Sequence, residues 1–320
     1  MNLTRRDSIF SLLAALGTRA MAQEFPSRPL AIIVPFAPGG STDVAGRAVA
    51  ERMSKSLGHA VIIDNKAGAA GQIGADFVAR AAPDGYTLGA IGASTGVHPH
   101  LIGPPPRYKF EDFTYIGQLA YVEVVLLARK NLEAGNVKEL IELARSRPGK
   151  LTCGDSGAAL ELAMELFKSA TKTSMVRVPY KGDAPALADL MGGHVDLAMI
   201  TVASAAAQIK AGSVKAIGVT SRSRSKAVPD VPTLAESGVT GYEAGVPTMM
   251  AVPRDTPRAI VDRLNAALNE ALADPALVER FTSLGLGIQR YSPAEAQGVV
   301  RAEYDKIARL IKDANLPTGR

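Results

Sequence analysis

Short apolar runs alternate with segments of helical periodicity along this chain, and this alternation restricts its fold more than any other feature. The apolar runs at 30–34, 61–63 and 87–91 are typical of buried strands. Helical patterns cover 44–57, which Gly58 ends, and 71–80. A strand–helix–strand–helix–strand order predicts a parallel sheet with helices on its faces.

A second alternating series follows the proline run Pro104–Pro106, which marks a loop. Two predicted strands, 115–119 and 122–128, open it. The helices and strands predicted after them are helices at 137–146, 158–170, 184–191 and 203–211, and strands near 151 and at 175–178, 197–200 and 214–220. One further strand at 248–252 precedes helices at 257–273, 275–284 and 293–314, each with a proline near its start. We therefore expect two α/β lobes followed by a helical tail.

The first 22 residues have the features of an export signal. Arg5 and Arg6 form a positively charged start, 9–16 is a short, mostly apolar stretch, and Ala20-Met21-Ala22 matches a small-x-small cleavage site. The apolar stretch is too short to span a bilayer. We expect residues 1–22 to be a cleaved signal peptide that directs the protein to the periplasm, by the general route or by the twin-arginine route.

Composition argues against several kinds of partner. Trp is absent and aromatic residues make up only 5% of the chain, so a stacking surface for nucleic acid is hard to build. The formal net charge of +5 is not concentrated in a basic stripe. Cys153 is the only cysteine, so it cannot form an internal disulfide, and we expect it to pack as a small apolar residue. We predict no nucleic-acid partner and no cofactor.

Four stretches, in order along the chain, resemble the Bug family, the extracytoplasmic receptors of tripartite tricarboxylate transporters. They are PFAPGGSTD at 35–43, DNKAGAAG at 64–71 with PDGYTL at 83–88, VPYKG at 178–182 with APALADL at 184–190, and PDVPTLAE at 229–236. The resemblance extends over about residues 26 to 315. Each stretch alone is a weak signal, but four in the same order are specific.

The resemblance implies an α/β fold of the periplasmic-binding-protein type II class, with two α/β lobes joined by two hinge crossovers. The first lobe would comprise 24–125 plus 248–320 and the second 126–247, with hinges near 125–130 and 245–248. Members of the family bind small carboxylates, mostly di- and tricarboxylates, acidic amino acids and aromatic acids. We therefore expect a monomeric receptor that captures such a ligand and delivers it to integral membrane subunits of a transporter.

The turn at Pro38–Asp43 is the strongest candidate for the binding site. It follows a predicted parallel strand and precedes a helix, and open α/β sheets bind ligands outside the carboxyl ends of their strands. Two glycines allow close approach of the backbone, and the helix N-terminus offers unpaired N–H groups to an anion. We expect Asp43 to cap the helix, because a carboxylate facing an anionic ligand would repel it. The predicted contacts are Phe36, Pro38, Gly39, Gly40, Ser41 and Thr42.

Four further segments are candidate contacts. Ser94 and Thr95 follow the third strand, and their hydroxyls can donate to a carboxylate. Lys181 would place a cation near a second carboxylate, and Thr201 follows the strand at 197–200. The fourth is the segment Asp155, Ser156 and Gly157, which precedes a helix of the second lobe.

The segment at 153–157 departs from the family pattern, in which a longer loop leads into a helix with a His-Leu pair. Here the loop is about two residues short, and Glu161 stands where that His would be if Leu162 aligns with the Leu. Asp155 would then select a ligand that carries an amino group, while Ser156 remains an anion donor. The departure leaves the identity of the ligand open.

Enzyme and signalling functions are the alternatives. Gly154–Gly157 matches the GDSG nucleophile sequence of chymotrypsin-like proteases, but none of the four His residues lies in the expected context and the pattern is α/β. His98 and His100 lack a nearby Glu or Cys to complete a metal set. A receptor that presents its ligand to a signalling partner, or an exported enzyme on the same fold, stays open as an alternative to a transport receptor without catalytic activity.

Overall fold

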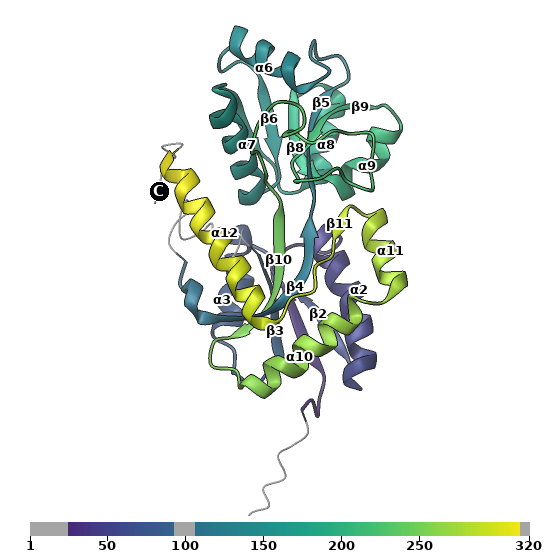
Figure 1. Ribbon diagram of the computed structural model, residues 1–320, viewed down its shortest axis with the longest axis vertical. Coiled ribbons are helices and arrows are strands. Elements are labelled where there is room, and N and C mark those ends of the chain that lie inside the picture. Colours follow the sequence, from purple (N-terminus) through teal and green to yellow (C-terminus); the bar gives the residue numbers. More distant parts are fainter. Residues whose placement is uncertain (1–24, 93–105, 314–320) are drawn as a thin grey trace, which may run out of the picture.

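The computed structural model describes residues 25–92 and 106–313. Two β-sheets form two lobes that lie one above the other along the longest axis of the molecule (Figure 1). The predicted signal peptide, Ser94 and Thr95, and His98 and His100 lie outside the described residues. Within the described ranges, no helix combines the length and the apolar character that crossing a membrane needs.

The first lobe contains a sheet of six strands in the order β11-β4-β10-β3-β1-β2. β1 pairs in parallel with β2 and β3, as the alternating sequence pattern predicts. β10 lies antiparallel between β3 and β4, so a strand from late in the chain completes the sheet. The strands are β1 Leu30–Val34, β2 Val61–Asn65, β3 Thr87–Gly92, β4 Phe113–Val122, β10 Val246–Pro253 and β11 Leu286–Gly287.

Helices cover both faces of this sheet. One apolar cluster joins it to α2, α10 and α11, and another joins it to α3, α12 and the aromatic side chains of residues 108–115. The helices are α2 Ser41–Leu57, α3 Gln72–Ala79, α10 Arg258–Ala271, α11 Pro275–Ser283 and α12 Pro293–Asp313, with short 3-10 turns at Ala69–Gly71 and Phe110–Asp112. The helical tail therefore returns to the first lobe.

The second lobe is built on the same plan around five strands in the order β7-β6-β8-β5-β9. β6 is parallel to β7 and β8, whereas β5 is antiparallel to β8 and β9. α6 and α7 pack on one face, and α8 and α9 pack on the other. The elements are β5 Val124–Arg129, β6 Thr152–Asp155, β7 Val176–Pro179, β8 Leu197–Thr201, β9 Val214–Val219, α6 Val137–Ser146, α7 Ala158–Thr171, α8 Asp183–Gly192 and α9 Val202–Lys210.

The chain passes between the two sheets at Glu123 and at Gly245. Glu123 is the single residue between β4 and β5, and Gly245 directly precedes β10. The sequence analysis drew the boundaries after residues 125 and 247, about two residues later at each crossing. Strand pairing explains the difference, because Val124 and Val125 pair with β8 in the second lobe while Val246 and Pro247 pair with β4 in the first.

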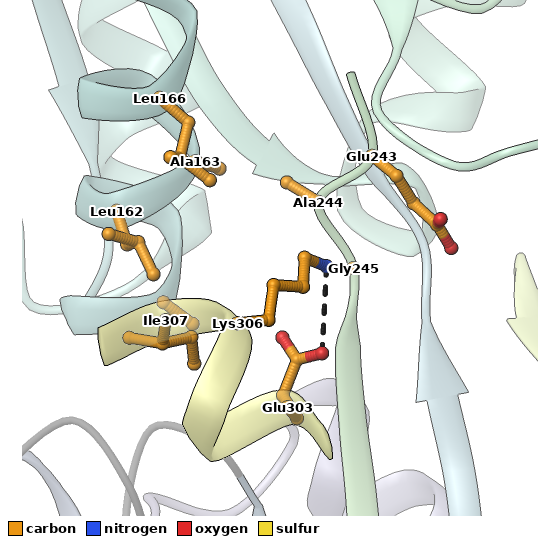
Figure 2. Close-up of a pocket in the computed structure, with 10 residues that line it drawn as sticks. Leu162, Ala163, Leu166, Glu243, Ala244, Gly245, Glu303, Lys306 and Ile307 are labelled. Atoms are coloured by element: carbon orange, nitrogen blue, oxygen red, sulfur yellow. Dashed lines mark ion pairs between the residues drawn. The ribbon is translucent and has the colours of Figure 1, made fainter. Parts of the chain in front are cut away.

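The lobes also meet beside the crossover at Gly245, where α7 packs against α12 (Figure 2). Leu162 of α7 belongs to the same apolar cluster as Val300 and Ile307 of α12. A cavity of about 20 Å³ lies there beside Ala244 and Gly245. The two lobes are therefore joined by the packing of α7 on α12 as well as by the two crossovers.

Candidate ligand-binding site

The β1–α2 turn, residues 36–42, lies at the carboxyl end of β1 and leads directly into α2. Gly39 has a φ of 87°, a left-handed conformation that favours glycine. Gly40 is the N-cap of α2 and has no side chain to satisfy the helix amides. Ala37, Pro38, Gly39 and Gly40 are exposed, so the turn presents its backbone to the solvent rather than to the core.

Asp43, the third residue of α2, stabilises this turn through hydrogen bonds to its buried carboxylate. The buried carboxylate accepts hydrogen bonds from the Gly39 N–H at 3.0 Å, from Nδ2 of Asn65 at 2.9 Å and from the Arg47 guanidinium at 2.9 Å. Burial alone would raise the pKa of Asp43, but the hydrogen bonds from Arg47, Gly39 and Asn65 hold it below the ordinary value. Asp43 therefore binds the turn before the helix, and neither of its oxygens is free for a ligand. The expected capping role is wrong, because the N-cap is Gly40 and no side chain caps the first amides of α2.

The first turn of α2 keeps donors that no cap satisfies. The first intrahelical bond within this stretch runs from the Val44 N–H to the Gly40 carbonyl, and Asp43 takes the Gly39 N–H. The N–H groups of Ser41 and Thr42, at the positive end of the helix dipole, are positioned for an anion. Ser41 adds a partly buried hydroxyl at the same place.

Three residues of the second lobe, Ser156, Asp183 and Thr201, form a hydrogen-bonded cluster opposite this turn. The Asp183 carboxylate accepts from Oγ1 of Thr201 at 2.6 Å, from the Thr201 N–H at 3.1 Å and from Oγ of Ser156. Asp183 is the first residue of α8, and Ser156 and Thr201 stand at or just after the carboxyl ends of the neighbouring strands β6 and β8. We call these three residues the Asp183 cluster.

The two lobes meet at this point. Oγ of Ser41 lies 3.5 Å from Oγ1 of Thr201, so the start of α2 faces the Asp183 cluster across the space between the lobes. Ser41, Ser156 and Thr201 were all predicted as contacts from the sequence, and the structure brings them together. Their role in binding stays a prediction.

Asp155 has a different environment from the one that the sequence suggested. Its carboxylate is buried and accepts two hydrogen bonds from Arg177, at 2.6 and 3.0 Å, and one from the Gly157 N–H at 3.2 Å. Arg177 also pairs with Glu161 at 3.0 Å. The pKa of Glu161 is nevertheless raised, mainly because the side chain is partly buried and also because the negative charge of Asp155 is close. Asp155 is thus committed to Arg177, which favours a structural role over the recognition of an amino group.

The remaining candidates are spread over the site. Phe36 is partly buried and its carbonyl accepts from Asn65, while Thr42 lies in the first turn of α2. Lys181 is exposed in the turn before α8. Cys153 is buried and burial raises the pKa of its thiol, in keeping with the expected packed residue.

Two residues of this region were missed by the sequence analysis as site residues. Neither Asp183 nor Arg177 is among the contacts predicted from the sequence. The signal for Asp183 was its place at the start of a helix that follows a strand beside β6, because carboxyl ends of adjacent parallel strands share one edge of a sheet. For Arg177 the sequence held no such signal, because the partner of a strand residue can be predicted only when the order of the strands in the sheet is known.

Two hollows in the described part of the chain are lined by none of the predicted contacts. One is the small cavity between α7 and α12, and the other is a space of about 130 Å³ beside Pro83, Asp112 and Arg254. The direct contact of Ser41 with Thr201 means that the two walls of the candidate site already touch. A ligand between them requires the lobes to move apart.

Comparison with known proteins identifies the family. The model of the tripartite tricarboxylate transporter family receptor matches residues 45–316. A protein encoded in the TAR-I ttuE–ttuC′ intergenic region of Agrobacterium vitis is 38% identical over 305 residues, 92% of this chain and 87% of that protein. The BugT protein of Bordetella pertussis is 33% identical over 98% of both chains.

Solved structures agree with the sequence relatives. The periplasmic binding protein BugD superposes with a TM-score of 0.82 at 37% identity, over 91% of this chain and 99% of BugD. Rpa4515 of R. palustris, solved with adipate, gives a TM-score of 0.85 at 34% identity with the same coverage. MatC of Rhodopseudomonas palustris, with bound malate, gives 0.81 at 33% identity over 90% of this chain and all of MatC. The periplasmic-binding-protein fold is thereby confirmed, and the chain belongs to the tripartite tricarboxylate transporter receptor family, whose members include the Bug solute-binding proteins.

Proposed function

We propose that this protein is an exported receptor that holds a small carboxylate between the β1–α2 turn and the Asp183 cluster, and delivers it to the integral membrane subunits of a tripartite transporter. The observation that carries the proposal is the 3.5 Å approach of Ser41 to Thr201 beside the uncapped start of α2. Both walls stand at carboxyl ends of strands, where α/β sheets bind ligands.

The chemistry of the first wall suits a carboxylate without a lysine or arginine. The N–H groups of Ser41 and Thr42 and the hydroxyl of Ser41 can donate to its two oxygens. Asp43 does not oppose this, because its charge is buried beneath the turn and paired with Arg47. Closure of the lobes would remove water from these hydrogen bonds and strengthen them.

The relatives give the ligand class its support. The solved structures of Rpa4515 and MatC contain adipate and malate, which are small carboxylates. The two crossovers at Glu123 and Gly245 are the positions at which we expect the lobes of a closing receptor to hinge. Export to the periplasm follows from the predicted signal peptide and from the periplasmic setting of BugD.

The proposal is tested by a thermal-shift screen of small mono-, di- and tricarboxylates on the protein without residues 1–22, followed by calorimetry on each hit. A preferred ligand raises the melting temperature through mass action, by an amount that grows with its concentration. Binding of none of these acids, or turnover of any of them, contradicts a receptor for carboxylates.

Gly40→Val checks the location of the site. An added Cβ would have its nearest neighbour, the Ala37 carbonyl, 3.7 Å away, and the φ of −74° suits any residue. The fold should therefore persist while the isopropyl group covers the amides of α2 and abolishes binding. Gly135→Val, before α6 in the second lobe, is the matched control and should bind normally.

Delivery to a transporter is tested separately by uptake of the labelled ligand in cells that lack the gene. The wild-type protein should restore uptake and Gly40→Val should not. Normal uptake in the cells without the gene would refute the transport role and leave the binding role intact.

A further inference from the structure

Asp183 gives the second lobe a wall that accepts hydrogen bonds instead of donating them. Its carboxylate takes the hydroxyl of Thr201 at 2.6 Å, the N–H of Thr201 at 3.1 Å and the hydroxyl of Ser156. These three donors are the groups that this wall would otherwise offer to an anion. Because Thr201 also reaches Ser41 at 3.5 Å, Asp183 acts where the two lobes meet and not at a distant surface.

The charges of the neighbouring residues strengthen this effect. Asp155 and Glu161 share Arg177, which contacts both at 3.0 Å or less. Among the ion pairs of the described residues, none joins Asp183 to a lysine or arginine, and its partners are the two hydroxyls and one N–H. Lys181, exposed in the turn before Asp183, adds a second cation to this wall, but it forms no ion pair with Asp183 in the part of the chain that the structure describes. The wall thus carries three carboxylates beside one guanidinium and one ammonium group, an excess of one carboxylate, so a second carboxylate of a ligand would meet negative charge.

We propose that Asp183 makes this receptor selective for carboxylates of single charge that carry a hydrogen-bond donor at the far end, and selects against dicarboxylates. The ligand's carboxylate binds the amides of α2, and its hydroxyl, amide or ammonium group donates to Asp183. A dicarboxylate would place its second charge against Asp183 without a partner, and such an unpaired charge discriminates effectively between two ligands. This inference rests on the proposed function and narrows its ligand class.

The test compares acids that differ only at the far end. The probes are succinate, succinamate and 4-hydroxybutyrate, and the set one carbon longer, glutarate, glutaramate and 5-hydroxyvalerate. Calorimetry on the wild-type protein should show the monoamide or hydroxy acid binding about tenfold tighter than its diacid. The difference arises because the second carboxylate of the diacid would face Asp183 without a hydrogen-bond donor to pair with.

Asp183→Asn removes the charge and retains the size of the side chain. In this variant the preference for the monoanion should fall by about tenfold or reverse, because an amide can donate to a second carboxylate. Asp189→Asn is the matched control. It lies on the same helix, and its carboxylate accepts from the hydroxyl of Tyr180, so the wild-type order of affinities should persist.

Diacids that bind the wild-type protein as tightly as their monoamides overturn the inference, as does an unchanged preference in Asp183→Asn. If such binding is abolished by Gly40→Val, the proposed function stands and only the selectivity is wrong. Failure of all six probes also counts against the inference, while any other carboxylate that binds in the wider screen keeps the proposed function in place. Circular dichroism confirms that Asp183→Asn is folded.

Discussion

Replacing Asp43 by Ala is expected to cost stability and binding together, because this side chain supports the turn that we propose as one wall of the binding site. The change removes the acceptor for the Gly39 N–H at 3.0 Å and for Nδ2 of Asn65 at 2.9 Å. Each hydrogen bond of this kind contributes on the order of 1 to 1.5 kcal/mol. The ion pair with Arg47 adds little, since that side chain is 52% exposed. The expected loss is therefore about 2–3 kcal/mol in the free energy of unfolding.

Urea unfolding followed by circular dichroism measures this loss, and Arg47→Ala is its control. The control removes only the exposed partner and should retain most of the stability. Ligand affinity of Asp43→Ala should also fall, because Gly39 loses the bond that fixes it. Equal free energies of unfolding for Asp43→Ala and Arg47→Ala would refute the claim that the buried hydrogen bonds, and not the ion pair, support the turn.

The dependence on pH provides a second test of the same residue. Hydrogen bonds from Arg47, Gly39 and Asn65 hold the pKa of Asp43 below its ordinary value, against the opposing effect of burial. A carboxyl group with a lowered folded pKa stabilises the protein above its unfolded pKa, and this contribution is lost as the pH falls through the folded pKa. The stability difference between the wild-type protein and Asp43→Asn should therefore shrink as the pH falls below the ordinary pKa of an aspartate, about 3.9, and through the lower pKa of the folded state. A constant difference over that range would contradict the cause assigned to the shift.

Three further predictions concern other parts of the molecule. Thr201→Val retains the shape but removes the hydroxyl that faces Ser41 and Asp183, and calorimetry should show binding weakened by about 1–2 kcal/mol. Leu162→Ala opens a space in the apolar contact of α7 with α12, where this side chain is 5% exposed, and should cost about 2–4 kcal/mol of unfolding free energy by urea titration. The thiol of Cys153 is buried and its pKa is raised, so iodoacetamide at pH 8 should label it only in denaturant, as mass spectrometry would show; labelling of the native protein at the denatured rate would contradict the packing of β6.

Sequence patterns predicted the local elements well where one face of each is buried. Leu30–Val34 is a short run of apolar residues, and it forms an interior strand of its sheet, between β3 and β2. The helix predicted over 44–57 begins three residues earlier, at Ser41, because Gly40 provides an N-cap without a polar side chain and gives little signal. The strand over 248–252 extends to Val246–Pro253, since its ends are fixed by pairing with β4.

Long-range neighbours are the part that the sequence did not show. The order of strands places β10 between β3 and β4, although some 120 residues or more separate it from either of them along the chain. Asp183 and Asp155 illustrate the consequence for the site. Both precede or begin helices of the second lobe, but Arg177 on β7 satisfies one, and hydroxyls from β8 and from the turn after β6 satisfy the other. Strand order decides which of the two carboxylates is paired with an arginine and which with hydroxyl groups, and local patterns do not encode strand order.

The crossovers connect this recognition to movement of the lobes. A Cβ at Gly245 would overlap the hydroxyl of Tyr121, which lies on β4 next to the other crossover. The two connecting segments therefore touch each other through one aromatic side chain. An opening of the proposed site would separate Ser41 from Thr201, whereas the contact of Tyr121 with Gly245 lies beside the crossovers themselves. A larger residue at 245 would force these segments apart, so its effect on affinity would arise from the relative position of the lobes and not from any contact with the ligand.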